Sequence, residues 1–214
     1  MSTASRRARN KETLKQRILD TARDMFVEHG YDGVTLRKIA HAIEYAPGTI
    51  YRYFKDKHEL IRALCISDFE SFERSFPRAT VPADPLAAIR AIGAAYIRFA
   101  LAHPNQYRLM FMTPKPPALH ELDDETLAKK GDPARDSYAL VRQMAQAAID
   151  AGRLRADLGD PDLFAQTLWA GVHGMASLEI TMGQDPWLEW GPVETRIEVM
   201  LDTLIRGVAC EGRP

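Results

Sequence analysis

The chain has 214 residues, of which 46% are apolar and 27% charged, and its formal net charge is −1. These values are typical of a globular protein with one large domain, or with a small domain joined to a larger one. No apolar run approaches the roughly 20 residues of a membrane-spanning helix, and no apolar stretch of a signal peptide follows the basic N-terminus. The two cysteines, Cys65 and Cys210, argue against a disulfide framework. We therefore expect a cytoplasmic protein with no membrane partner.

The small net charge hides an uneven distribution along the chain. Residues 1–62 contain 13 Lys and Arg against 8 Asp and Glu, whereas residues 63–214 contain the remaining 15 against 21. The first part therefore carries +5 and the second −6, which together give −1. A basic N-terminal part favours contact with a polyanion, although random scatter of surface charge is the alternative explanation.

The first 60 residues show the spacing of successive helices. An apolar series that ends at His29-Gly30 predicts a long first helix. Thr35 can cap a short second helix, and Pro47 suits the first position of a third. Asp56 and Glu59 can form a capping box at the start of a long fourth helix. We expect residues 1–11 to be a flexible basic arm and residues 12–56 to form a helix-turn-helix domain.

The remainder of the chain also shows helical periodicity. The stretch ATVPADP (79–85) predicts a loop, and the polar segment 118–133 predicts largely irregular structure. Asp160-Pro161 and Ala151-Gly152 are typical of a helix start and a helix end. The expected helices lie at about 86–103, 104–112, 138–151, 161–183 and 193–210. Because no convincing strand alternation occurs, we expect an all-α fold, with residues 57–210 forming a helical-bundle ligand-binding and dimerisation domain.

Motifs of catalysis are missing from the sequence. It contains no nucleophile elbow, Walker loop, dinucleotide-binding glycine motif, C-x-x-C or H-E-x-x-H. His120-Glu121 with Asp123, Asp124 and Glu125 lacks a recognisable metal-ligand spacing, and a solvated acidic loop is the simpler interpretation. We expect no enzyme activity, no metal and no cofactor.

The two short helices of the first part predict a DNA-reading unit. Their spacing directs a set of apolar side chains inwards: Leu36, Ile39, Ala40, Ile43, Ile50 and Phe54. Tyr51 and Tyr53 then remain partly outward, where a phenol can pack on sugar and donate to a phosphate. Thr35 and Lys57 stand at helix N-termini, where free backbone N–H groups favour phosphate. Arg52 is the side chain best able to read a guanine edge.

The segment GYDGVTLRKIAHAIEYAPGTIYRYFKDKHEL (30–60) resembles the TetR-type transcriptional repressors. The positions in register with that family are Gly30, Tyr31, Thr35, Ile39, Ala40, Gly48, Thr49, Ile50, Tyr51, Tyr53, Phe54, Lys57 and Leu60. The resemblance implies phosphate contacts for Thr35, Tyr51, Tyr53 and Lys57. It implies groove contacts for Arg37, Pro47, Thr49 and Arg52, and we add Gly48 to the expected DNA-binding residues.

The turn of the helix-turn-helix departs from the family pattern. Relatives carry A-G-V-S where this chain has Ile43-Glu44-Tyr45-Ala46. Glu44 therefore replaces a glycine, and keeping a left-handed backbone there would cost about 1 kcal/mol or somewhat more. Ala46 removes the usual hydroxyl cap. We expect the fold to survive these changes, but the operator sequence cannot be carried over from relatives.

The C-terminal part resembles regulators whose ligand domain has a W…HG signature. The matching stretches are HPNQYRLMF, AGRL (151–154) and LWAGVHGMASLE (168–179), with Trp169, His173 and Gly174 as the signature. The family resemblance implies a homodimer through the last two helices, about 161–183 and 193–210. The alternative is that both helices only complete the core of the monomer.

Aromatic and sulfur-containing side chains of the larger domain are candidates for an apolar effector pocket, with Gln143 and His173 as polar anchors. The predicted ligand-binding residues are Phe69, Tyr96, Phe99, Tyr107, Met110, Phe111, Tyr138, Gln143, Met144, Trp169 and His173. Taken singly, each is more often part of an ordinary core. We expect a dimeric repressor released from a palindromic DNA operator by a small apolar molecule; a helical enzyme or carrier with an incidental basic face is the alternative.

Overall fold

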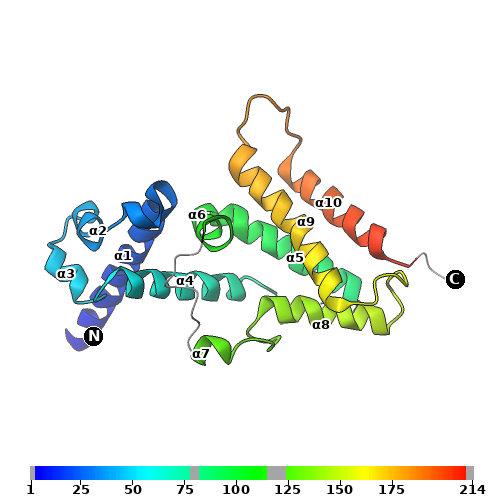
Figure 1. Cartoon of the computed structure of the whole chain (residues 1–214), viewed down its shortest axis with the longest axis horizontal. Coiled ribbons are helices and arrows are strands. Elements are labelled where there is room, and N and C mark those ends of the chain that lie inside the picture. Colours follow the sequence, from blue (N-terminus) through cyan, green and yellow to red (C-terminus); the bar gives the residue numbers. More distant parts are fainter. Residues whose placement is uncertain (1–2, 78–81, 115–123, 211–214) are drawn as a thin grey trace. The chain divides into compact units, whose positions relative to one another are not determined.

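The computed structural model describes residues 3–77, 82–114 and 124–210, and these residues are helical apart from turns and one isolated β-bridge between Leu154 and Ala209 (Figure 1). The expected all-α fold is confirmed. The chain divides into two compact units. The first comprises the described residues of 1–70 and 105–122, and the second those of 71–104 and 123–214. This division differs from the expected boundary after residue 56, because the start of the fourth helix and the segment after residue 104 belong with the N-terminal helices.

The first unit contains the expected succession of helices. Their bounds are α1 Thr3–Gly33, α2 Leu36–Ala42, α3 Pro47–Tyr51, the first part of α4 Lys57–Arg74, most of α6 Pro104–Tyr107, and the π-helix η2 Arg108–Met112. Gly30 interrupts α1 with a left-handed backbone (φ 69°), at the position where the sequence predicted its end. Two short helices therefore follow one long helix, as a helix-turn-helix requires.

The N-terminus differs from the expectation of a flexible arm, because residues 3–11 lie in α1. The physical reason lies in the composition: glycine and proline are absent from residues 3–29, and Arg6, Arg7 and Lys11 are good helix formers. This part of the helix is exposed. Its basic side chains are consequently carried on a regular helix.

Local capping explains where the short helices begin. The Thr35 hydroxyl accepts a hydrogen bond from the Lys38 backbone N–H (3.2 Å), and Pro47 occupies the first turn of α3. At the start of α4, the Asp56 carboxylate accepts from the Glu59 N–H (2.8 Å), and the Glu59 carboxylate accepts from the Lys55 N–H (2.7 Å). The capping box therefore forms, with Glu59 reaching one residue further back than predicted.

The first unit has its own hydrophobic core, in which the predicted inward side chains of α2 and α3 are buried. The core residues are Ile18, Leu19, Ala22, Phe26, Val34, Leu36, Ile39, Ala40, Ile43, Ile50, Phe54, Leu60, Ile61, Leu64, Cys65 and Leu109. They come from α1 to α4 and from η2, so the DNA-reading helices are fixed on a scaffold that includes the first turns of α4.

A buried ion pair lies beside this core. Asp68 of α4 is fully buried and Arg23 of α1 nearly so. The guanidinium donates two parallel hydrogen bonds to the carboxylate, from Nε to Oδ2 (2.9 Å) and from Nη2 to Oδ1 (2.6 Å). Gln106 Nε2 also donates to Asp68 (3.0 Å), and Arg23 Nη1 donates to Asp20 (2.7 Å). The network joins α1, α4 and α6 through one carboxylate.

Glu44 has the left-handed backbone that the turn demands, with φ 60°. The Glu44 N–H donates to the His41 carbonyl (3.0 Å) and the Tyr45 N–H donates to the Ala40 carbonyl (2.9 Å). These two bonds are the Schellman arrangement that ends a helix, in which the left-handed position is usually a glycine. The expected strain at Glu44 is therefore present in the fold.

Replacing Glu44 by glycine should raise the free energy of unfolding by about 1 kcal/mol relative to Glu44→Ala. Both variants lose the carboxylate, but only glycine also loses the Cβ that opposes φ 60°. Urea unfolding of both variants measures the difference. Equal stability of the glycine and alanine variants would contradict this account of the turn.

The second unit is a bundle around α9. Its helices are α5 Pro85–Ala102, α7 Asp124–Leu127, α8 Ser137–Asp150, α9 Pro161–Met182 and α10 Val193–Val208, together with the end of α4. The helix α9 packs against α5, α8 and α10 (Figure 1). Its start is capped by Asp160, whose carboxylate accepts from the Asp162 N–H (2.8 Å), as predicted.

Two glycines let α10 approach the bundle closely. A Cβ at Gly171 of α9 would lie 2.6 Å from a methyl of Leu204, and one at Gly93 of α5 would lie 2.9 Å from a methyl of Leu201. Both distances are shorter than van der Waals contact allows. The absence of a side chain at these positions therefore sets how deeply the leucines of α10 enter the bundle.

Among the described residues, α5 is the one helix with the length and hydropathy of a membrane span. Half of that stretch is buried inside the second unit. A helix in the core of a protein can have the same length and hydropathy as a membrane span.

Candidate nucleic-acid interface

The residues predicted to bind DNA gather around α3 and the starts of α2 and α4, all in the first unit. Thr35, Arg37, Pro47, Gly48, Tyr51 and Arg52 are exposed, and Thr49, Tyr53 and Lys57 are partly exposed. The Tyr51 side chain is 49% exposed, whereas its neighbour Ile50 is fully buried. A Cβ at Gly48 would meet no atom within 4 Å, so the free protein does not need a glycine there.

Lys57 has partners within the protein. Its ammonium donates to the Tyr31 carbonyl (2.9 Å) and lies over the Tyr31 ring, 4.1 Å from the centroid. The lysine thereby connects the start of α4 to the last turn of α1, just after Gly30. Its contact with phosphate remains a prediction.

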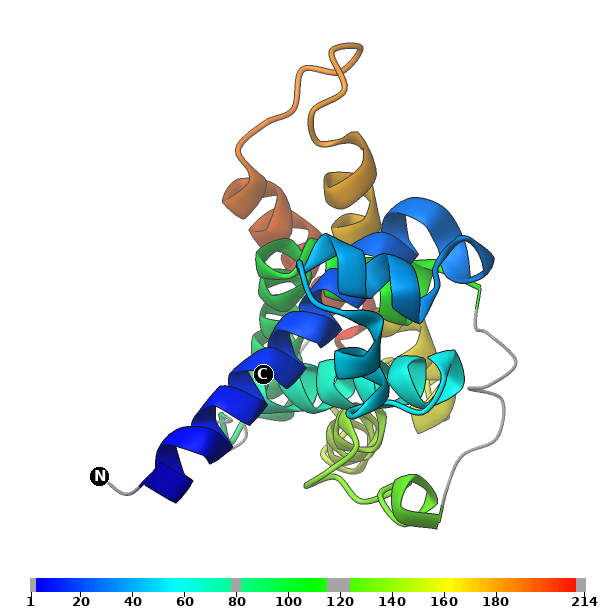
Figure 2. The ribbon, with the colours of Figure 1, turned by 90° about the vertical axis from the view of Figure 1, so that its left-hand side faces the viewer.

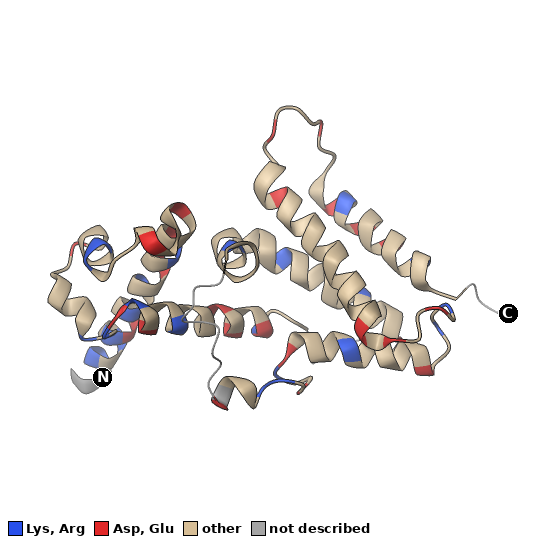
Figure 3. Ribbon diagram, in the orientation of Figure 1, with Lys and Arg blue, Asp and Glu red and all other residues tan. Residues whose placement is uncertain are grey.

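A groove lies between the N-terminal half of α1 and the end of α3, and sequence reasoning did not anticipate it. It has a volume of about 490 Å³. The side chains that line it are Arg7, Asn10, Lys11, Leu14, Tyr45, Arg52 and Tyr53. In Figure 3 blue ribbon segments mark Lys and Arg positions along the N-terminal half of α1. The sequence could have indicated the side of the groove formed by α1, because residues 7, 10, 11 and 14 have the spacing of one helix face.

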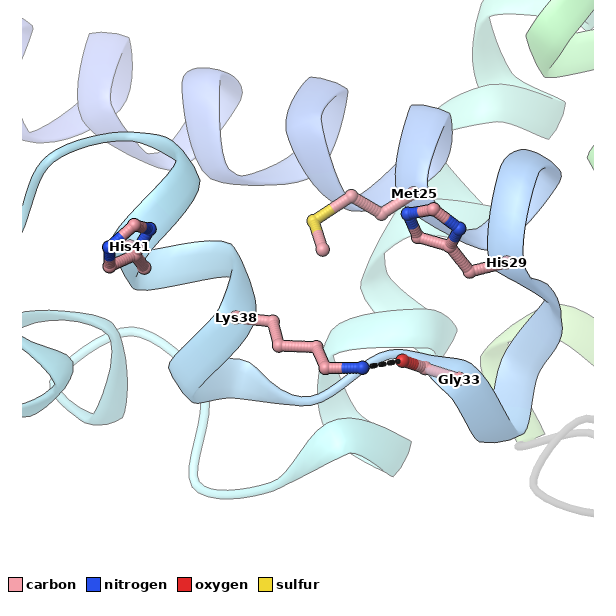
Figure 4. Close-up of a pocket in the computed structure, with 5 residues that line it drawn as sticks. All are labelled: Met25, His29, Gly33, Lys38 and His41. Atoms are coloured by element: carbon pink, nitrogen blue, oxygen red, sulfur yellow. Dashed lines mark hydrogen bonds between the residues drawn. The ribbon is translucent and has the colours of Figure 1, made fainter.

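A second hollow lies between the end of α1 and α2 (Figure 4). It has a volume of about 390 Å³ and is lined by Met25, His29, Gly33, Lys38 and His41. The side chain of Lys38, in α2, extends back to the end of α1. There its ammonium donates to the Gly33 carbonyl (2.7 Å), as the dashed line in Figure 4 marks. Lys38 thus braces the turn that precedes α2.

The predicted effector residues fall into two groups, one in each unit. Phe69, Tyr107, Met110 and Phe111 belong to the first unit. The Phe111 ring contacts Tyr107 (centroids 5.1 Å apart) and Phe69 (5.9 Å). Tyr107 is fully buried and Met110 nearly so, whereas Phe69 is partly exposed. This group lies on α4, α6 and η2.

The second group contains an aromatic cluster centred on Phe72. That ring contacts Phe76, Tyr96 and Phe99 at centroid distances of 4.8, 5.5 and 5.2 Å. Trp169 Nε1 donates to the Tyr96 hydroxyl (2.9 Å), which connects the signature tryptophan to the cluster. Neither Phe72 nor Phe76 is among the ligand-binding residues predicted from the sequence.

The other predicted effector residues of the second unit differ in burial. Met144 is buried, and His173 is partly buried. Burial lowers the pKa of the His173 imidazole, because desolvation disfavours its charged form. Tyr138 and Gln143 are exposed, and the Tyr138 hydroxyl donates to Asp162 (3.0 Å). The ligand contacts of these residues stay predictions.

The helix α9 has an exposed apolar stripe. Leu163, Ala170, Gly174 and Leu178 recur at helical spacing, and Leu163 and Leu178 are each about half exposed. On α10, Val199 is 60% exposed. These are the two helices predicted to pair with a second copy of the chain.

Comparison with protein families decides the class of the chain. Residues 18–64 match the model of bacterial regulatory proteins of the tetR family, and residues 89–204 match the tetracyclin repressor-like C-terminal domain. The chain belongs to the TetR family. It is a ligand-responsive transcriptional regulator with an N-terminal helix-turn-helix, and this membership places it among DNA-binding regulators rather than enzymes.

Curated relatives support this membership over much of their length. The HTH-type transcriptional regulator Mb1846 of Mycobacterium bovis is 26% identical over 192 residues, which cover 79% of this chain and 82% of the relative. The HTH-type transcriptional repressor AcnR of Corynebacterium efficiens is 29% identical over 144 residues, covering 67% and 70%. A solved structure of a protein of unknown function from Rhodococcus sp. RHA1 has a TM-score of 0.68 and 26% identity, covering 92% and 96%.

Proposed function

We propose that this TetR-family protein is a dimeric repressor that binds a two-fold symmetric DNA operator and leaves it when a small apolar effector binds. The observation that carries the proposal is the exposure of Tyr51, Pro47 and Thr35 on helices whose opposite faces are buried. A short helix fixed in this way can enter the major groove while its neighbours contact phosphates. Such a regulator works on the chromosome, so we expect it in the cytoplasm.

The exposed apolar stripe of α9 and Val199 of α10 support the proposed homodimer. Several large exposed apolar side chains on neighbouring helices are typical of surfaces that a partner covers. A second copy is the partner that we propose, because helix-turn-helix dimers read two half-sites about 34 Å apart, one turn of DNA.

The aromatic residues support an apolar effector. The cluster around Phe72 combines four rings with the indole N–H of Trp169, and Met144 and His173 lie in the same unit. Apolar walls with few polar groups are typical of small-molecule sites. The effector releases DNA only if it binds the released state more tightly than the DNA-bound state.

Footprinting on the DNA upstream of the protein's own gene tests the proposal. We expect two protected half-sites related by two-fold symmetry, with centres one DNA turn apart. The experiment is run at low salt, because phosphate contacts dominate affinity. Absence of protection under these conditions would contradict the repressor assignment.

Replacing Tyr51 by phenylalanine should weaken binding of the dimer on the order of a hundredfold, about tenfold for each of its two Tyr51 side chains, on operator and unrelated duplexes alike. The change removes only the hydroxyl, whose hydrogen bond to a charged phosphate is worth about 1.5 kcal/mol. Fluorescence anisotropy with both duplexes measures the loss. Tyr138→Phe is the matched control, because Tyr138 lies in the second unit. An operator-specific loss would instead indicate that Tyr51 reads a base.

A further inference from the structure

The groove between α1 and α3 combines the side chains that bind a nucleic-acid backbone. Arg7, Lys11 and Arg52 supply three cations, and Tyr45 and Tyr53 supply two phenols. None of the side chains lining the groove, all within the described residues, is a carboxylate. Cations can neutralise phosphates there, while phenol rings pack on sugars and their hydroxyls donate to phosphate oxygens.

The groove is held in place by the core of the first unit. Leu14 and Tyr53 are partly buried and pack against that core. Ile18 and Leu19, about one turn further along α1, are buried in it. Because α1 is helical from Thr3, Arg7 and Lys11 project from the same face as Leu14. Both cations therefore keep a fixed relation to Arg52.

The position of Arg52 distinguishes it from the residues at the start of α3. Arg52 is the C-cap of this helix, whereas Pro47, Gly48 and Thr49 form its first turn. In helix-turn-helix proteins the N-terminal residues of the recognition helix contact base edges. The end of the helix lies further from the bases, and here it adjoins the cations of α1.

We propose that this groove binds the sugar–phosphate backbone of DNA beside the base pairs read by α3. Arg52 acts there with Arg7 and Lys11 and does not read a base. The assignment extends the interface from the helix-turn-helix onto the N-terminal turns of α1. It rests on the proposed DNA-binding function, and it replaces the role that the sequence suggested for Arg52.

The double variant Arg7→Ala/Lys11→Ala tests the groove. The affinity of the wild-type protein for its footprinted DNA is measured by anisotropy from 50 to 300 mM KCl. The slope of log affinity against log salt is negative, and each lost phosphate contact reduces its magnitude by about 0.9. In the dimer the double variant removes four contacts, two from each protomer, so we expect the slope to lose about 3.6 in magnitude and the affinity to fall about tenfold per removed cation near 0.1 M salt.

Arg9→Ala is the matched control for charge. Arg9 is exposed on the same helix and lies about 200° around it from Arg7, away from the groove. Because the groove variant loses two positive charges, a second control, Arg9→Ala/Arg17→Ala, loses the same number. Neither of these arginines lines the groove. Circular dichroism checks that α1 stays helical, which alanine favours. An equal loss of slope in control and groove variants would overturn the proposal.

Arg52→Ala separates the two roles of that residue. Competition against operators with single base changes should show an unaltered base preference, together with a salt slope smaller in magnitude by about 2, because each of the two protomers loses one phosphate contact. A relaxed base preference with an unchanged slope would overturn the assignment. If the wild-type protein protects no DNA, the repressor function itself fails, and this outcome is distinct from binding that is insensitive to the groove variants.

Discussion

Replacing Asp68 by asparagine should lower the free energy of unfolding by about 3 kcal/mol. The change keeps the shape of the side chain but leaves the buried Arg23 guanidinium without its bidentate partner. Burial opposes the charge on Arg23, yet the hydrogen bonds to Asp68 and Asp20 outweigh it and raise the pKa of the guanidinium. A guanidinium keeps its charge in proteins whatever its partners, so Arg23 cannot escape the loss of Asp68 by deprotonation, which is why the cost is large.

Urea unfolding measures this loss, and two further variants make the result specific. Asp20→Asn is the matched control, because Asp20 binds the same guanidinium but is half exposed, and such a pair contributes about 0–1 kcal/mol. The double replacement Arg23→Met/Asp68→Leu removes both charges and should recover most of the stability. The prediction is wrong if Asp68→Asn costs no more than Asp20→Asn.

The same ion pair bears on how a ligand signal reaches DNA. It fixes the part of α4 before Glu70 to α1, so those turns belong with the DNA-reading helices. The helix continues into the second unit at Ser71. We therefore expect effector binding to reorient α1, the two short helices and the first turns of α4 as one rigid body. The short helices should keep their arrangement relative to α1.

Local sequence signals predicted most of the helix-turn-helix. Thr35, Pro47 and Asp56 mark helix starts through capping geometry that involves only the next few residues, so their spacing is readable without a structure. Helical spacing also indicated the outward-facing residues of α3, and the family resemblance added the DNA contacts that these residues are expected to make. The left-handed backbone of Glu44 was also expected, because the turn geometry is stronger than the preference of one residue.

Long-range features were not predictable in the same way. Arg23 and Asp68 are 45 residues apart, and nothing in either local pattern indicates the other. The groove needs both Lys11 and Arg52, which meet only once α1 is known to be helical through its basic end. The effector residues illustrate the same limit: Phe69 and Trp169 were predicted to line an apolar pocket because they are aromatic, but each is more than a third exposed.

Introducing a carboxylate at Leu178 should convert the proposed dimer into monomers. Leu178 is 51% exposed in the single chain, so Leu178→Glu should leave the monomer's stability nearly unchanged. In a dimer interface the same carboxylate would be desolvated without a partner, which costs several kcal/mol. A cost of about 3 kcal/mol already raises the dissociation constant more than a hundredfold. Analytical ultracentrifugation measures this constant directly.

Leu127→Glu is the matched control, because Leu127 is exposed to a similar extent (47%) but lies on α7 in the same unit. This variant should remain dimeric. The monomeric Leu178→Glu protein should also lose at least a hundredfold in operator affinity, because one recognition helix must then bind without its tethered partner. Retention of the dimer by Leu178→Glu would exclude the exposed stripe of α9 as the interface. A monomer with full operator affinity would instead show that DNA binding does not require dimerisation. That result would contradict the proposal of a two-fold symmetric operator.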